Sequence, residues 1–321
     1  MNDWVKWTIG FIVALLLLSF LCFVLNTFYL QNSSYFHEKN AGMGLEMFKA
    51  VDHFQRRVCK KVKNKRIALS FSSNADYLQT ARRNCIKTVQ QKGIDSCYIA
   101  NMDYIDEKFK KQNENIFKER SGAGKWIWKS YIILKFLDEN IERNDFLFYI
   151  DGDFALVDPI DGVLCIQLRE NQDIALFSQF HIERRWTKGD SFILMNLNSN
   201  EIERMASSIQ TYAGFVVVRK TINSLRFIAE WQTYSQDERL ILDKPNGLNL
   251  KPNYKGFRLP RNDQSIVSLL SKRGQILVWP NPLEAWGKAR PQTENGTVYM
   301  PYKEIDATKF KLGWPLVTRY E

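Results

Sequence analysis

Histidine and closely paired cysteine are scarce in this sequence. Only three histidines occur in 321 residues, and the five cysteines include no C-x-x-C pair. Because structural zinc sites are built from four cysteine or histidine ligands, this scarcity argues against such a site. Internal repeats and low-complexity blocks are also missing, and the content of 45% hydrophobic and 13% aromatic residues can bury a large core. A folded body of enzyme size is expected.

Charged side chains are absent from Trp7 to Phe36, and Ile9–Leu25 within this segment is almost entirely apolar. The hydrocarbon core of a bilayer needs about 20 apolar residues of helix. A cleaved signal peptide has an apolar region of roughly 7–15 residues followed by small residues, and no convincing A-x-A site follows here. The sequence therefore predicts an uncleaved transmembrane signal anchor at 7–30, between a short tail at 1–6 and a stem at 31–62.

The orientation of this anchor is only weakly indicated by charge. Lys6 and the amino terminus oppose a basic run at Arg56–Arg66, and long domains translocate largely regardless of charge. The Asn-x-Ser/Thr sequons at Asn32 and Asn295 are compatible with a lumenal body. We expect a type II, single-pass protein of the Golgi or endoplasmic reticulum with a lumenal catalytic domain, and a cytoplasmic orientation stays open.

The net charge of +10 is compatible with a nucleic acid, an anionic membrane surface or phosphorylated ligands. Much of the excess lies in Arg56–Arg66, just beyond the membrane segment, which favours a juxtamembrane role. We therefore expect no nucleic-acid partner. The even set Cys59, Cys85, Cys97 and Cys165 leaves two interpretations open, disulfides in an oxidising lumen or small buried side chains.

Apolar runs alternate with amphipathic segments through the rest of the chain. Arg66–Phe71 is typical of a buried strand, and residues 75–93 have apolar positions at helical spacing. This rhythm predicts an α/β fold, with a mostly parallel central sheet flanked by helices, over a catalytic domain at 63–321. Further strands are expected at 95–102, 146–150, 173–180, 211–221 and 274–280, and further helices at 126–137, 224–235 and 263–274.

Two aspartates end the apolar run Phe146–Ile150, which the sequence predicts as a central strand because strands buried on both faces are continuously apolar. Open α/β sheets bind ligands outside the carboxyl ends of their strands, where Asp151 and Asp153 fall. Gly152 between them permits a close approach of a ligand. Carboxylates suit Mg²⁺ or Mn²⁺, which are commonly held together with substrate phosphates. An ordinary turn is the alternative, and the nearby Asp158-Pro159 favours a site.

Four segments resemble, in order along the chain, motifs of nucleotide-sugar glycosyltransferases of the GT-A type. They are "GKWIWKSYIIL", "FLFYIDGDFALVDP", "YAGFVVVRKTINSLRFIAEW" and "NDQSIVSLL", and the likeness extends from about Arg66 to Leu270. The resemblance implies a GT-A-like, Rossmann-like fold. It also implies that Asp151 and Asp153 bind a divalent metal, Mn²⁺ or Mg²⁺, that bridges the donor diphosphate and acts as a Lewis acid on the leaving group.

Further residues become candidates for binding the nucleotide or donor. Ser72 and Asn74 follow the first strand, where related folds hold the nucleotide, and an ordinary polar turn is the alternative. Lys129 is a candidate for a phosphate contact, and Trp128 for stacking on a base or sugar, with simple packing as its alternative. Gly214 lies in an "AGF" segment that is expected to form a turn lining the sugar pocket.

Asp263 and Gln264 match an Asp-Gln pair that lies near the donor sugar and acceptor in related enzymes. The resemblance gives Asp263 either a hydrogen-bonding role or, in an inverting reaction, the role of general base. A helix N-cap is the alternative for Asp263. Two departures from the family pattern are evident. No histidine after His181 completes the metal shell, and Ser130 replaces the proline of the W-x-W-K-P-Y element.

These observations predict a membrane-anchored glycosyltransferase that moves a sugar from a nucleotide diphosphate donor to a hydroxyl of a glycan, glycoprotein or glycolipid. The nucleotide-binding half is expected at about 63–160 and the acceptor half at about 161–321. Two alternatives stay open. One is a metal-dependent nucleotidyltransferase or phosphodiesterase that uses the same acids, and the other is a non-catalytic, membrane-tethered carbohydrate-binding protein.

Overall fold

The computed structural model describes residues 64–90, 93–156, 160–169, 171–276 and 278–279, and three short strands at 293–294, 297–298 and 317–319. All of them belong to one compact unit, Gln55–Glu321. The predicted anchor, the stem, both sequons, Cys59 and Asp158-Pro159 lie outside the described residues. Among the helices that are described, none combines the length and hydrophobicity needed to cross a bilayer.

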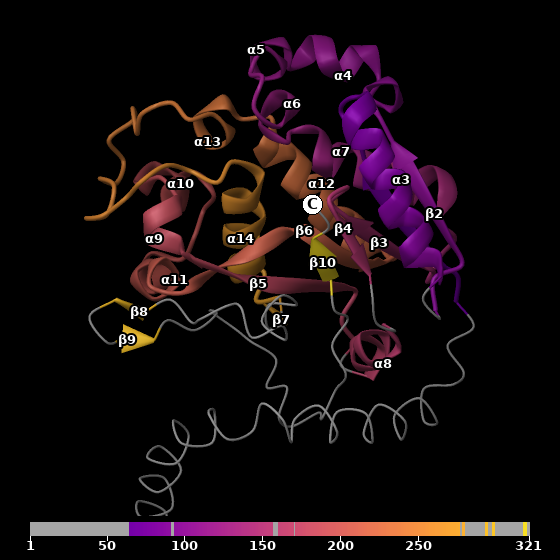
Figure 1. Cartoon of the computed structure of the whole chain (residues 1–321). Coiled ribbons are helices and arrows are strands. Elements are labelled where there is room, and N and C mark those ends of the chain that lie inside the picture. Colours follow the sequence, from indigo (N-terminus) through magenta and orange to yellow (C-terminus); the bar gives the residue numbers. More distant parts are fainter. Residues whose placement is uncertain are drawn as a thin grey trace, which may run out of the picture. The chain divides into compact units, whose positions relative to one another are not determined.

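A six-stranded sheet forms the centre of this unit (Figure 1). Its strands, in order across the sheet, are β2 (Ser96–Ala100), β1 (Arg66–Phe71), β3 (Phe146–Ile150), β6 (Ile209–Arg219), β5 (Ile174–Ile182) and β7 (Val278–Trp279). β6 runs antiparallel to both of its neighbours, whereas the other pairs are parallel. The expected α/β fold with a mostly parallel sheet is confirmed, and the reversed strand β6 is an addition that apolar patterning does not reveal.

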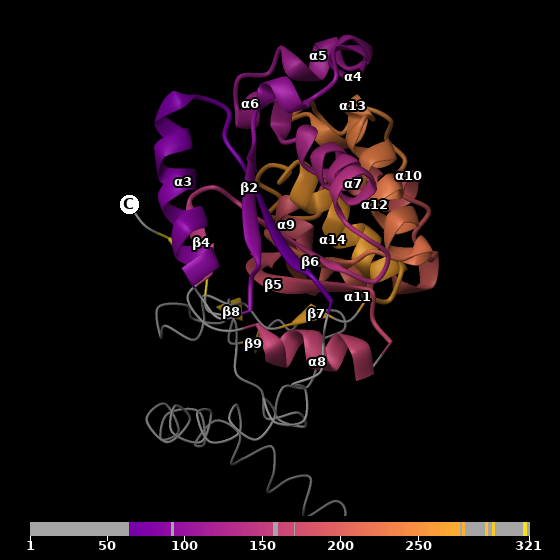
Figure 2. The same ribbon diagram turned by 90° about the vertical axis from the view of Figure 1, so that its right-hand side faces the viewer.

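Side chains of β3 alternate between the two faces of the sheet, because successive residues of a strand point in opposite directions. Leu147 and Tyr149 join one buried cluster with residues of α7 (Trp128–Asn140), α12 (Ile222–Ser235) and α14 (Asp263–Arg273). Phe146, Phe148 and Ile150 join a second cluster with residues of α8 (Asp161–Arg169). Figure 2 shows α8 on the opposite side of the sheet from the other three helices. Burial on both faces explains why this strand is apolar throughout.

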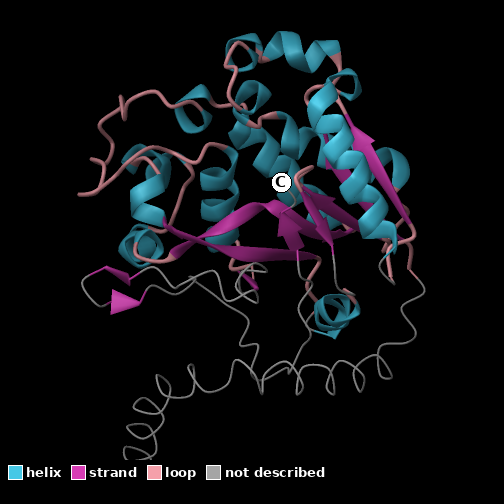
Figure 3. Ribbon diagram, in the orientation of Figure 1, coloured by secondary structure: helices cyan, strands magenta, loops and turns pink. Residues whose placement is uncertain are grey.

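Shorter helices cover the remaining borders of the sheet (Figure 3). The predicted helices at 75–93, 126–137, 224–235 and 263–274 are confirmed within a few residues at each end. The predicted helix at 75–93 is α3 (Ala75–Gln90). The shorter helices are α4 (Glu107–Gln112), α5 (Glu114–Phe117), α6 (Gly122–Lys125), α9 (Glu183–Trp186), α10 (Gly189–Leu194), α11 (Ile202–Ala206) and α13 (Glu238–Ile241), with 3₁₀ turns at Met102–Tyr104 and Ser199–Glu201.

Strand pairing beyond the central sheet was not predicted. β4 (Phe154–Leu156), which directly follows the Asp-Gly-Asp segment, pairs antiparallel with β10 (Val317–Arg319). β8 (Thr293–Glu294) and β9 (Thr297–Val298) form a separate antiparallel pair. The pairing of β4 with β10 brings a segment near the carboxyl terminus beside the two aspartates.

Candidate functional site

The Asp-Gly-Asp segment forms a tight turn at the carboxyl end of β3. The Asp151 amide donates to the Gly214 carbonyl of β6 at 2.9 Å, and the Phe154 amide donates to the Asp151 carbonyl at 2.9 Å. A Cβ atom added at Gly152 would lie 2.8 Å from the Phe71 carbonyl oxygen, so only glycine fits between this turn and β1. The predicted position of the two acids at a strand end is confirmed.

Lys129 is a buried cation that contacts two carboxylates from distant parts of the chain. Its Nζ atom lies 3.1 Å from Asp151 Oδ1 and 3.3 Å from Asp263 Oδ2, and the residue is 3% exposed. Burial alone would lower the pKa of Lys129, but the charges of Asp151 and Asp263 outweigh it and raise the pKa above its usual value. The ammonium therefore stays charged and joins α7, the end of β3 and α14.

Tyr149 fixes the orientation of Asp151. Its hydroxyl donates to Asp151 Oδ1 at 2.6 Å. Burial and the adjacent Asp151 carboxylate raise the pKa of Tyr149 well above its usual value, so the hydroxyl remains a donor. The pattern could have revealed this contact, because residues two apart at a strand end lie on the same face.

Gly214 lies inside β6, which corrects the expected turn at Ala213–Phe215. A Cβ atom at Gly214 would lie 2.6 Å from Asp151 Oδ2 and 2.3 Å from the Tyr212 hydroxyl. Both distances are far below van der Waals contact. The glycine is therefore needed because the Asp151 carboxylate and Tyr212 occupy the space above the strand.

Asp263 is the first residue of α14 and is 4% exposed. The N-cap interpretation is wrong, because Asn262 occupies the cap position. Burial and then the charge of Asp151 raise the pKa of Asp263 to about 6, although Lys129 acts in the opposite direction. Its Oδ2 atom, which lies beside the Lys129 ammonium, accepts no hydrogen bond from the described part of the chain.

Strained backbone occurs just before two of the residues in the Lys129 contact: at 122–126, before Lys129, and at Asn262, before Asp263. Asn262, directly before Asp263, has φ 50° and ψ −119°, and its side-chain amide donates to the Ile241 carbonyl at 2.7 Å and to Asp243 Oδ1 at 2.8 Å. Asp243 also pairs with Lys125 at 2.5 Å. Lys125 has φ 54° within a run of positive φ values at 122–126. Such conformations cost about 1–3 kcal/mol each and persist where the surroundings hold them.

Gln264 belongs to a buried polar network that sequence reasoning missed. Its amide nitrogen donates to Gln210 Oε1 at 2.8 Å, and the Gln210 amide donates to Glu183 Oε1 at 2.9 Å. Glu183 is fully buried and pairs with Lys272 of α14. Isolated polar residues in apolar segments carry no pattern that joins them. The predicted place of Gln264 near the donor sugar and acceptor stays a prediction, and its amide nitrogen already donates within the protein.

The other residues predicted to bind the nucleotide or the sugar donor make contacts within the protein itself. Ser72 Oγ donates to the Asn74 carbonyl at 2.7 Å, and Asn74 Oδ1 accepts from the Tyr77 amide at 2.9 Å, at the start of α3. Trp128 is 5% exposed, and its ring stacks on Phe71 with centroids 3.7 Å apart. The burial of Trp128 favours packing over stacking on a ligand. Nucleotide contacts of Ser72 and Asn74 stay predictions.

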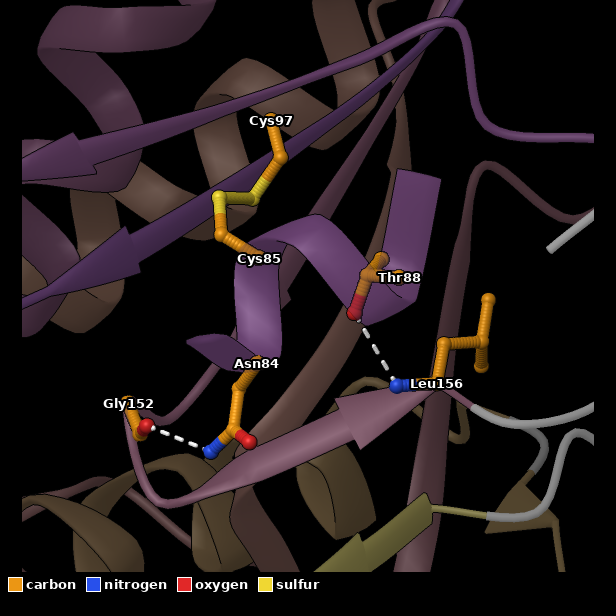
Figure 4. Close-up of a disulfide and its surroundings, with 6 residues drawn as sticks. All are labelled: Asn84, Cys85, Thr88, Cys97, Gly152 and Leu156. Carbon is orange, nitrogen blue, oxygen red and sulfur yellow. Dashed lines mark hydrogen bonds between the residues drawn. A yellow bond between two sulfur atoms is a disulfide. The ribbon is translucent and has the colours of Figure 1, made fainter. Parts of the chain in front are cut away.

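α3 holds the Asp-Gly-Asp turn from the other side (Figure 4). The side-chain amide of buried Asn84 donates to the Gly152 carbonyl at 2.9 Å. One turn further along α3, Thr88 Oγ1 accepts from the Leu156 amide at 3.1 Å. The helix therefore binds the backbone of the turn and of β4 at two points. Sequence reasoning assigned neither residue, because helical periodicity marks them only as a polar face.

A disulfide joins α3 to the edge strand β2. Cys85 and Cys97 are bonded, with Cα atoms 5.7 Å apart (Figure 4). The disulfide interpretation is therefore confirmed for Cys85 and Cys97. Because Asn84 precedes Cys85, the covalent link anchors the helix at the level of its contact with Gly152.

The predicted Mn²⁺ or Mg²⁺ fits the ligand chemistry of Asp151 and Asp153. Both supply hard oxygen atoms, the Asp151 side chain is 24% exposed, and Asp153 is half-buried. Within the described residues, no group of three or more His, Cys, Asp or Glu side chains is placed to hold a metal. Two carboxylates are enough for Mg²⁺, because this ion usually keeps several waters and binds one or two carboxylates together with substrate phosphates.

Comparison with known proteins gives distant structural likenesses. No protein-family model and no curated protein matches the chain. The solved structures include the apo form of mouse xyloside xylosyltransferase 1, with 7% identity, 67% of this chain and 84% of that chain covered, and a TM-score of 0.36. An active-site mutant of LgtC is similar at 14% identity, with coverages of 79% and 86% and a TM-score of 0.36. Likeness at such scores carries no weight for function.

Proposed function

We propose that this chain is a glycosyltransferase that moves a sugar from a nucleotide diphosphate donor to a hydroxyl of a glycan, glycoprotein or glycolipid. The observation that carries the proposal is the convergence of Asp151 and Asp263 on the buried ammonium of Lys129. These groups come from the end of β3, from α14 and from α7, at the sheet edge where α/β folds bind ligands.

Asp151 and Asp153 would hold Mn²⁺ or Mg²⁺. When bound, the ion neutralises charge on the departing nucleoside diphosphate. Lys129 and Tyr149 fix Asp151 Oδ1, whereas Asp151 Oδ2 lies above Gly214 beside the Tyr212 side chain.

Asp263 would act on the sugar or the acceptor. Its Oδ2 atom is buried 3.3 Å from the Lys129 ammonium, and this ion pair and the first turn of α14 fix its place. A carboxylate in this state can accept a hydrogen bond from a sugar hydroxyl, or take the proton of the acceptor hydroxyl in an inverting reaction. Gln264 would support this turn through Gln210.

A lumenal, type II, single-pass arrangement is part of the proposal. The uncharged segment 7–30 supports a membrane anchor. The Cys85–Cys97 disulfide supports an oxidising compartment such as the Golgi or endoplasmic reticulum.

A panel of nucleotide sugars tests this function. The full-length chain is incubated with each donor, with and without Mn²⁺, and the products are identified. We expect Mn²⁺-dependent release of a nucleoside diphosphate with transfer or hydrolysis of the sugar. Asp151→Asn, Asp153→Asn and Asp263→Asn should remove this activity, whereas Asp138→Asn, at an exposed acid of α7, should retain it.

The products also separate the alternatives. Release of pyrophosphate or cleavage of a diester would indicate a nucleotidyltransferase or phosphodiesterase. Glycan binding without turnover, unaffected by EDTA and by Asp151→Asn, would indicate a non-catalytic carbohydrate-binding protein.

A further inference from the structure

Two arginines surround one half-buried tryptophan beside the candidate site. The Arg258 and Arg261 guanidinium carbons lie over the Trp186 ring, 5.5 and 5.7 Å from its centroid. The His181 ring lies 4.6 Å from the same indole, between centroids. These four residues, the Trp186 cluster, combine a planar apolar surface with two fixed positive charges.

Within the described residues, no acid pairs with the two arginines of the Trp186 cluster. Neither Arg258 nor Arg261 forms an ion pair or a side-chain hydrogen bond in the described structure, whereas Arg219 and Arg273 pair with acids. Arg258 is exposed. Burial and the two arginines lower the pKa of His181 to about 4, so His181 is neutral at pH 7, and its buried Nδ1 atom has no hydrogen-bond partner.

The Trp186 cluster packs against the turn that carries Asp263. The Trp186 carbonyl accepts from Ser265 Oγ at 2.7 Å and from the Arg261 amide at 3.0 Å. Arg261 itself precedes Asp263 by two residues. Figure 1 shows α9, which ends at Trp186, beside α14.

The sheet order separates the Trp186 cluster from the predicted metal-binding acids. His181 and Trp186 belong to the end of β5 and to the helix after it, whereas Asp151 follows β3. β6 lies between these strands, and β3 and β5 point in the same direction because both are antiparallel to it. Both groups therefore lie at the same edge of the sheet, on either side of β6.

We propose that the Trp186 cluster is an anion-binding subsite that holds a phosphate group of the acceptor. Guanidinium groups bind phosphate through paired hydrogen bonds, and two unpaired arginines on one indole offer such donors without first breaking an ion pair. The Trp186 cluster packs on the turn that carries Asp263, and it comes from β5, on the other side of β6 from β3, which supports assigning the phosphate to the acceptor and not to the donor. This assignment to an acceptor rests on the proposed function, whereas the binding of an anion does not.

Calorimetry with glucose 6-phosphate and neutral glucose as probes tests the subsite. The full-length chain is titrated in EDTA, so that no metal-bound phosphate contributes. We expect glucose 6-phosphate to bind and glucose not to bind. Arg258→Ala and Arg261→Ala should each weaken binding at least about tenfold, because charge-assisted hydrogen bonds are lost. Arg258→Lys should recover part of the affinity, and Lys255→Ala, which removes an exposed charge from the same segment, should change it less than twofold.

Competition distinguishes the two sources of phosphate. With Mn²⁺ present, a nucleoside diphosphate should leave glucose 6-phosphate binding in place. Displacement of the probe would overturn the assignment to the acceptor, and equal affinities of wild type and Arg258→Ala would overturn the subsite. Arginine-dependent binding by a chain that turns over no nucleotide sugar would support the subsite while contradicting the proposed glycosyltransferase.

Discussion

At the scale of single residues, the site depends on the space around the Asp151 carboxylate. Gly214 leaves that space free on β6, and Lys129 and Tyr149 fix one oxygen of the carboxylate from the other side. The two aspartates and their strand end could be predicted from the run Phe146–Ile150, because its pattern is local. The Lys129 contact could not, because it joins residues that are far apart in the sequence.

Gly214→Ala should reduce the proposed transferase activity strongly, with folding checked by circular dichroism. The new methyl group would lie 2.3 Å from the Tyr212 ring and hydroxyl and 2.6 Å from Asp151 Oδ2, so both side chains must move. Displacements of about 1 Å can cost roughly 100-fold in rate, and we expect a loss of that order in kcat/KM. Gly247→Ala is the matched control, because a Cβ atom there meets only one atom, at 3.7 Å. Full activity of Gly214→Ala would show that Asp151 does not need this position.

Asp263→Asn should stabilise the metal-free protein at neutral pH while removing activity. The folded-state pKa of about 6 lies above the ordinary value of 3.8 for an aspartate, so the folded chain binds the proton more tightly than the unfolded chain. Stability is therefore lost as pH rises from about 4 to about 6, by up to about 3 kcal/mol. Urea unfolding in EDTA at pH 4 and pH 7.5 checks this.

The gain of Asp263→Asn over wild type should be large at pH 7.5 and small at pH 4. Asp138→Asn, at an exposed acid, should show no such dependence on pH. Equal stability of wild type and Asp263→Asn at both pH values would contradict the burial of an ionised Asp263.

At the scale of secondary-structure elements, α3 positions the Asp-Gly-Asp turn. Its helical pattern was predicted, but the contacts of Asn84 with Gly152 and of Thr88 with Leu156 depend on how the helix packs. For the "AGF" segment, by contrast, the predicted local structure itself was wrong. The segment was expected to form a turn within the predicted strand 211–221, whereas β6 continues through Gly214, and the glycine leaves room for the Asp151 and Tyr212 side chains.

Asn84→Ala should weaken both the fold and the activity. The Gly152 carbonyl would lose its donor, which costs about 1–3 kcal/mol for a buried group. Because Gly152 lies between the two predicted metal ligands, we also expect the Mn²⁺ concentration for half-maximal activity to rise. Gln79→Ala truncates an exposed amide on the same helix and serves as the control. A lower stability with unchanged Mn²⁺ dependence would show that Asn84 contributes to folding and not to the position of the metal ligands.

Reduction of the disulfide should loosen the same helix. Cys85 and Cys97 are 12 residues apart, and closing a loop of that size stabilises a fold by about 2–3 kcal/mol. Urea unfolding with and without dithiothreitol, with Cys85→Ala/Cys97→Ala as a reference insensitive to the reductant, measures the difference. Identical curves for oxidised and reduced wild type would contradict a stabilising link between α3 and β2.

At the scale of the whole molecule, the order and type of elements followed from apolar periodicity, whereas long-range pairing did not. The strand β10 pairs with β4, although the two strands are far apart in the sequence, and no local pattern predicts this pairing. The same holds for the network from Gln264 to Glu183, which links α14 to the end of β5. Sequence patterns therefore located the two acids of the site but not the framework that positions them.

The most direct test of the central claim is the release of nucleoside diphosphate from a nucleotide sugar, measured against Mn²⁺ concentration. Wild-type chain is compared with Asp151→Asn and with the exposed control Asp138→Asn, each checked for folding by circular dichroism. We predict saturable, Mn²⁺-dependent release by wild type and by the control, and none by folded Asp151→Asn. Undiminished release by Asp151→Asn would contradict the assignment of this site to metal-assisted sugar transfer.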